Sequence, residues 1–83
     1  MNAGDAEAAV LALLSERQSG ETICPSEAAR RIAADKEADW REAMPIVHEA
    51  VDRLLSQKII KLSWKGDECA ARSGPYRIQR AND

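Results

Sequence analysis

Eighty-three residues are enough for one small domain, and we expect that domain to cover residues 1–83, ordered from about 5 to 80 with short flexible termini. The apolar fraction of 45% and the charged fraction of 31% are typical of a globular chain, and the length excludes a catalytic domain joined to a separate binding domain. No apolar run approaches the roughly 20 residues of a membrane span, and the acidic residues Asp5 and Glu7 differ from the basic start of a secretory signal. These features predict a cytoplasmic protein without a membrane partner.

The net charge of −2 argues against a strongly basic nucleic-acid-binding protein, but the charge is unevenly distributed. Residues 1–58 hold eleven acids and seven bases, a net of −4. Residues 59–83 hold five bases and three acids, a net of +2. The C-terminal part is therefore the positive part of the chain.

The first predicted helix covers residues 5–18. Apolar side chains recur there at helical spacing, with Leu11 widening the stripe: Ala6, Val10, Leu13 and Leu14. Ser19 and Gly20 end this helix, because glycine tolerates the left-handed conformation that follows a helix. Residues 21–23 then predict a very short strand.

A second helix is predicted to start around Cys24 and Pro25. Proline suits the first helical position, where its missing N–H would have no partner in any case. Cys24 then occupies the cap and Glu27 completes a capping box, although Ser26 is an alternative cap because serine caps better than cysteine. Small side chains form a face suited to close helix packing: Ala28, Ala29, Ile32 and Ala33.

The third helix contains a proline. Asp39 caps its start and Glu42 completes a second capping box. Pro45 lacks the N–H that would bind Arg41, so we predict a single turn at 40–43, a kink, and a main helix from 45 to 57. Its predicted buried face consists of Val47, Ala50, Val51, Leu54 and Leu55.

Residues 59–64 and 76–80 alternate in polarity and predict a two-stranded hairpin with a loop at 65–75. If Leu62 pairs with Ile78, the core face consists of Ile60, Leu62, Trp64, Tyr76 and Ile78. The outer face then consists of Lys61, Ser63, Arg77 and Gln79, without an acid in either strand. The complete order predicts an α+β winged helix-turn-helix with three helices and a small antiparallel β-hairpin wing.

Three blocks of residues also resemble one narrower family. They are Ile23-Cys24-Pro25-Ser26-Glu27-Ala28-Ala29-Arg30, then Asp39-Trp40-Arg41 with Met44-Pro45, then Lys65-Gly66 with Ala71-Arg72-Ser73-Gly74-Pro75-Tyr76-Arg77-Ile78. In this order they are similar to the small bacterial winged-helix-like proteins of domain-of-unknown-function family 3253, from about Val10 to Arg80. Ser73 lengthens the segment that the family has before its Gly-Pro. The family has no established activity, so the resemblance implies a fold and no catalytic residues.

Nucleic-acid binding is the first functional hypothesis. The wing bases predicted to contact phosphates are Lys61, Lys65, Arg72, Arg77 and Arg80. The third helix would add Arg41, His48 and Arg53, although Glu49 and Asp52 on the same helix disfavour contact with phosphates. The simpler alternative is a solvated basic face that offsets the acidic helices.

Docking to a protein partner, or dimerisation, is the second hypothesis, because helix-turn-helix folds also serve as interaction modules. We expect no enzyme, since only Cys24 at a helix start and the single His48 could act, and no third group completes a catalytic arrangement. With two cysteines, Cys24 and Cys69, and one histidine, the chain predicts no metal site, no cofactor and two reduced thiols.

Overall fold

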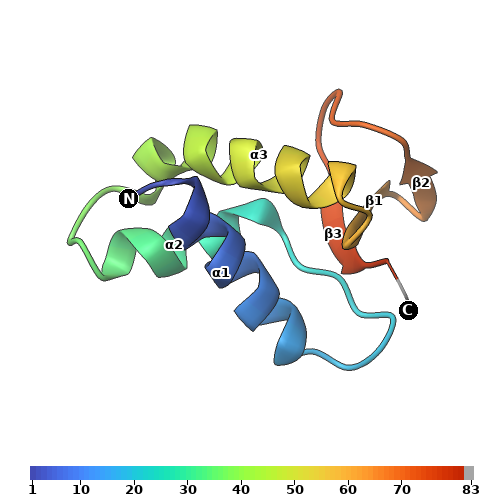
Figure 1. Cartoon of the computed structure of the whole chain (residues 1–83), viewed down its shortest axis with the longest axis horizontal. Coiled ribbons are helices and arrows are strands. Elements are labelled where there is room, and N and C mark those ends of the chain that lie inside the picture. Colours follow the sequence, from blue (N-terminus) through green and yellow to red (C-terminus); the bar gives the residue numbers. More distant parts are fainter. Residues whose placement is uncertain (82–83) are drawn as a thin grey trace.

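The architecture follows the predicted order of elements. A computed structural model describes residues 1–81 (Figure 1). It contains α1 (Ala3–Ser15), α2 (Pro25–Ala34), α3 (Trp40–Ser56), β1 (Ile60–Trp64), β2 (Asp67–Cys69) and β3 (Arg77–Arg80). Three helices therefore precede a small antiparallel sheet, which confirms the α+β winged-helix prediction. Asn82 and Asp83, part of the predicted flexible terminus, lie outside the described residues.

The first helix begins and ends earlier than residues 5–18. Asn2 caps it, because its side-chain Oδ1 accepts a hydrogen bond from the N–H of Asp5 at 2.9 Å. At the other end the N–H of Arg17 binds the carbonyl of Leu14, a tighter i to i−3 bond. The N–H of Gln18 then binds the Glu21 carboxylate at 2.6 Å, so these last residues leave the α-helical pattern.

The second helix starts at the first of its two predicted caps. Cys24 has the extended backbone of a cap residue, and its N–H donates to Oε2 of Glu27 at 2.7 Å. The small-residue face is confirmed as buried: Ala28, Ala29, Ile32 and Ala33.

Helices α2 and α3 end in the same way. Glu37 after α2 and Lys58 after α3 have left-handed backbone angles, with φ of 54° and 62°. In each case the N–H of the next residue donates a hydrogen bond to the carbonyl five residues earlier, from Ala38 to Ala33 at 3.0 Å and from Ile59 to Leu54 at 3.1 Å. This is the Schellman arrangement, in which glycine is the usual left-handed residue.

The predicted break in the third helix is wrong. A single helix runs from Trp40 to Ser56 through Pro45. Proline removes only one backbone bond, and Pro45 is exposed, so its ring displaces no buried side chain. The helix keeps its capped start, where Asp39 accepts from the N–H of Arg41 at 2.9 Å, and a buried face that holds it against the core. Of the predicted face, only Leu55 is partly exposed.

The sheet has one strand more than predicted, in the order β2-β1-β3. The pairing of Leu62 with Ile78 is confirmed, and Lys61 pairs with Gln79. The predicted loop contains β2, which pairs with β1 through a two-residue turn at Lys65 and Gly66. Both turn residues have positive φ, 52° and 89°, as the tight turns of hairpins require.

The short strand predicted at 21–23 is reduced to one bridge. Ile23 exchanges two backbone hydrogen bonds of 2.8 Å with Ile78, so the segment between α1 and α2 is attached to the free side of β3. Both side chains are fully buried. One hydrophobic cluster contains residues of all three helices, of β1 and of β3.

Candidate nucleic-acid interface

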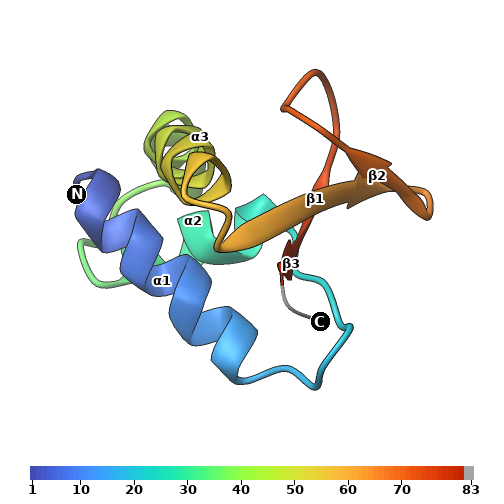
Figure 2. The same ribbon diagram turned by 45° about the vertical axis from the view of Figure 1, so that its right-hand side comes forward.

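The wing is built on β1 and β2, which extend beyond the helices. Figure 2 shows the two strands projecting away from α1 and α2, and the chain after β2 returning towards the body. Ser63 lies between Glu68 of β2 and Arg77 of β3, so these three side chains share the outer face of the sheet. Strand β2, which was not predicted, thus adds an acid to the outer face, on which β1 and β3 have none.

Arg72, one of the predicted phosphate contacts, is bound to α3. Its Nε and Nη2 donate to the two carboxylate oxygens of Asp52, each at 2.8 Å. This hydrogen-bonded pair lowers the pKa of Asp52 and raises the pKa of Arg72. The loop that leads to β3 is therefore held against α3, and the charge of Arg72 is neutralised there.

His48 lies one helical turn before Asp52 and makes a second contact with the returning chain. Its Nδ1 is 2.7 Å from the hydroxyl oxygen of Tyr76, and the two rings are tilted by 55° at 5.7 Å between centroids. Burial, and then the charge of Arg72, lower the pKa of His48, while burial raises the pKa of Tyr76. Near pH 7 the imidazole is neutral and the tyrosine hydroxyl stays protonated, so Nδ1 of His48 can accept a hydrogen bond from Tyr76.

The two arginines predicted on α3 also have acidic neighbours. Arg53 lies 3.6 Å from a carboxylate oxygen of Glu7 on α1 and 3.5 Å from one of Glu49 on its own helix. Arg41, whose side chain is 71% exposed, lies 3.5 Å from the Asp39 carboxylate. Its guanidinium also lies over the Trp40 ring, 4.7 Å from the centroid. Helix α3 therefore presents its bases together with acids.

Arg77 and Lys65 differ from these arginines. The guanidinium of Arg77 donates to Oγ1 of Thr22 at 2.7 Å and to the Thr22 carbonyl at 3.3 Å, both uncharged acceptors. Lys65 is exposed at the hairpin turn, and within residues 1–81 it has no hydrogen bond or ion pair. Arg80 donates to the carbonyl of Arg17 at 3.4 Å, and Lys61 is half-buried on the outer face. The structure thus separates Arg41, Arg53 and Arg72, which lie beside acids, from Arg77 and Lys65 of the wing.

Trp64 corrects one prediction and adds a residue to the site. Alternation along β1 places it on the side of Leu62, as expected, but its side chain is 39% exposed. Strands β1 and β2 extend beyond the helices (Figure 2). The cross-strand neighbour of Trp64 is Asp67 of the unpredicted β2. The glycine of the Lys65-Gly66 pair was the signal in the sequence for a turn at this hairpin tip.

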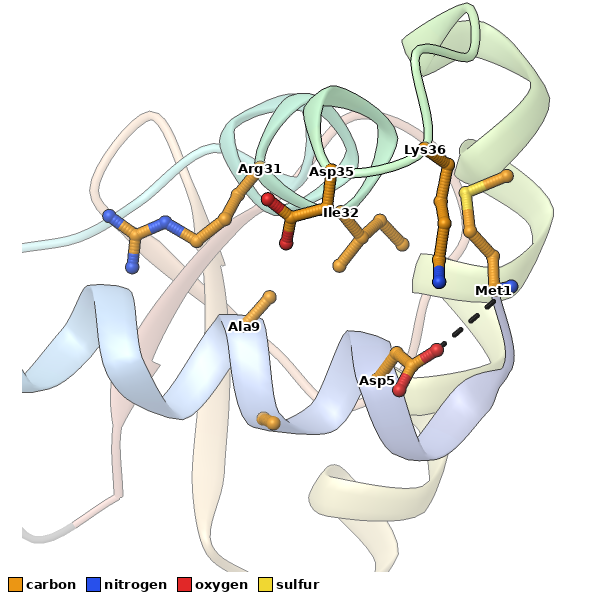
Figure 3. A pocket seen from close by; sticks show the side chains of 8 residues that line it. Met1, Asp5, Ala9, Arg31, Ile32, Asp35 and Lys36 are labelled. Carbon is orange, nitrogen blue, oxygen red and sulfur yellow. Dashed lines mark ion pairs between the residues drawn. The ribbon is translucent and has the colours of Figure 1, made fainter.

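Neither of two hollows on the surface of residues 1–81 gathers the predicted site residues. The larger, of about 320 Å³, lies between α1 and α2 (Figure 3). Figure 3 shows carboxylates and amino groups on its two sides, among them Asp5, Asp35 and Lys36, so it has no uniform charge. The smaller, of about 170 Å³, lies on the outer face of the sheet between Lys61 and Glu68.

Neither cysteine takes part in a disulfide within the described residues. Cys24 Sγ lies 3.1 Å from Oγ of Ser26, within the cap of α2. Within residues 1–81 no three possible metal ligands come together, and none of the helices has the length and apolarity needed to cross a bilayer.

Fold and wing together define a small winged-helix-like protein of the α+β class. The chain belongs to the family described as "Protein of unknown function (DUF3253)", whose model matches residues 4–81. The match confirms the resemblance noted in the sequence and extends it to nearly the whole chain. A comparison with curated proteins finds no match.

Proposed function

We propose that this protein is a non-enzymatic module that binds nucleic-acid phosphates weakly through its wing. The observation that carries the proposal is the difference between the two groups of bases. Arg77 is held by uncharged atoms of Thr22 and Lys65 by none in the described chain, so both keep their charge available to an anion. Lys65 lies in the turn between β1 and β2, the two strands that project from the helices (Figure 2), and Arg77 begins β3 and pairs with Ser63 of β1.

The second helix of the motif, α3, is a poor reader of bases in this proposal. Asp52 and His48 are occupied by Arg72 and Tyr76 of the protein itself. Glu42 and Glu49, seven residues apart on one side of α3, are exposed and would repel phosphates. Contacts made by the wing alone would fix position on a phosphate backbone and carry little sequence information.

The proposal is tested by titrating the protein into a fluorescent random-sequence duplex at low and then at physiological salt. We expect dissociation constants of about 1–100 µM at physiological salt and a steep loss of affinity as salt increases. Replacing Lys65→Glu and Arg77→Glu together should weaken binding and reduce the slope of log affinity against log salt by about two, since each phosphate contact contributes about 0.9.

The matched control is Arg30→Glu with Lys36→Glu, the same change of charge in exposed residues of α2 and the turn after it. Binding by the wing predicts that this control retains most of the affinity. Equal losses in both double variants would mean that only net charge matters. Absence of binding to any nucleic acid at low salt would overturn the proposal.

One observation favours a second candidate, docking to a basic protein. Glu42 is exposed on α3 and has no ion pair within residues 1–81. Glu49 lies on the same side of this helix. A partner rich in lysine or arginine would complement this surface. A mass that rises with concentration in sedimentation, without any shift on nucleic acid, would instead favour self-association.

A further inference from the structure

We propose that Trp64 at the tip of the wing stacks on an unpaired base, so that the preferred nucleic acid is single-stranded. This inference rests on the function proposed above and names the class of ligand for the same wing. Trp64 is 39% exposed, whereas Tyr76, the aromatic residue directly before β3, is buried.

Trp64 is the last residue of β1, directly before the turn of the hairpin. Trp64 pairs with Asp67 across a two-residue turn whose residues both have the positive φ that such turns require. Stacking on bases is the way in which exposed aromatic side chains bind single strands without sequence preference.

Charges of both signs lie near the ring, Asp67 across from it and Lys65 next to it in the chain, and the lysine is the one that suits a phosphate-bearing strand. Lys65 follows Trp64 directly and has no bonded partner in residues 1–81, so it can meet the phosphate next to a stacked base. Arg77 lies on the opposite face of the sheet, because it pairs with Ser63, the residue before Trp64. A flexible single strand can bend over the tip and reach both faces.

A duplex cannot use the same contacts. Its bases are stacked on each other, so the ring faces are covered except at the ends. Asp67, directly across from Trp64, would also oppose the dense phosphates of a duplex. The wing should therefore bind an unstructured strand more tightly than a blunt duplex of the same length.

The test uses a labelled oligothymidylate of about 12 nucleotides, within the site sizes of single-strand-binding proteins, and a blunt duplex of equal length. Trp64→Leu keeps an apolar side chain but removes the aromatic face, and should weaken binding to the strand about 5- to 150-fold. Its affinity for the duplex should change far less. Trp64→Phe retains a ring and should keep most of the affinity.

Tryptophan fluorescence provides a second measurement, which reports on the ring directly. Saturation with oligothymidylate should quench the wild-type emission, and the quenching should disappear in Trp64→Phe, which keeps Trp40 as its remaining indole. Unchanged strand affinity in Trp64→Leu together with salt-dependent duplex binding would overturn this inference and leave the proposed function intact. Equal losses for strand and duplex would show insertion into a duplex instead. Absence of binding to both ligands would overturn both proposals.

Discussion

The basic side chains predicted to bind nucleic acid differ mainly in the groups to which they bond within the protein. Sequence reasoning could find each base and place it on a helix or strand. It could not foresee that Arg72 would meet Asp52, twenty residues earlier, or that Tyr76 would meet His48. These pairs depend on the path of the loop after β2, which the sequence pattern did not predict. Partners therefore decide which bases remain available, and partners are a property of the folded chain.

His48 should make stability depend on pH. Its pKa is lowered in the folded protein by burial and by Arg72, with Asp52 opposing the effect, so the unfolded chain binds the proton more readily. The free energy of unfolding should decrease as pH falls through about 6.5, the ordinary value for histidine, and level off below the folded pKa. Urea unfolding between pH 8 and 5 measures this.

His48→Gln is the control for this prediction, because glutamine keeps polar atoms but does not titrate. Its stability should vary less than that of the wild type over the same pH range. Asp52 affects a lower range, since its lowered pKa contributes stability that is lost only as pH falls below about 4. A wild-type curve that is flat between pH 7 and 5 would contradict the assigned role of His48.

At the scale of elements, the three helices were predictable from the sequence and strand β2 was not. Caps, apolar spacing and glycine or proline positions identified all three helices, because these signals act within a few residues. The strand β2, Asp67–Cys69, is short, and two of its three residues are acids that are uncommon in strands. Its pairing comes from the turn at Lys65 and Gly66. Pro45 led to a predicted break in α3 that is absent, because the tertiary packing of this helix outweighs one missing hydrogen bond.

Replacing Pro45 by alanine should stabilise the protein. Alanine restores the backbone bond to the carbonyl of Arg41, and the side chain is exposed, so no packing is lost. Proline is about 3 kcal/mol less favourable than alanine inside a helix, and the greater freedom of the unfolded alanine chain removes part of the gain. We expect a gain of about 1–2 kcal/mol in the free energy of unfolding.

Chemical denaturation of Pro45→Ala measures this gain, with Glu42→Ala as a control at another exposed position of the same helix. The control should lie within about 0.5 kcal/mol of the wild type. Equal or lower stability of Pro45→Ala would mean that the proline ring makes a favourable contact.

At the scale of the whole molecule, helices and sheet depend on one core. Ile78 shows this, because it pairs with Leu62 in β1 and with Ile23 between the first two helices. The apolar alternation in the sequence predicted the pairing with Leu62. The sequence could not predict how far β1 extends past the helices, and for that reason the exposure of Trp64 was missed.

Ile78→Val should lower the free energy of unfolding by about 0.5–1.5 kcal/mol, because Ile78 is fully buried. Helical circular dichroism and tryptophan fluorescence should shift together in denaturant, since the same core supports both parts. The control is Ile59→Val, the same change in a side chain that is 40% exposed, which should be nearly neutral. Separate transitions for helices and sheet would contradict a single cooperative unit.

The residues with left-handed backbone angles that end α2 and α3 make the protein less stable than it would be with glycine there. Glu37 and Lys58 hold a conformation that costs a side-chain-bearing residue about 1–2 kcal/mol and that glycine adopts without strain. Both positions are exposed and lie away from Trp64 and Arg77. A chain with glycine at these two helix ends would therefore be a more tolerant host, in which the wing can be varied residue by residue without approaching the limit of folding.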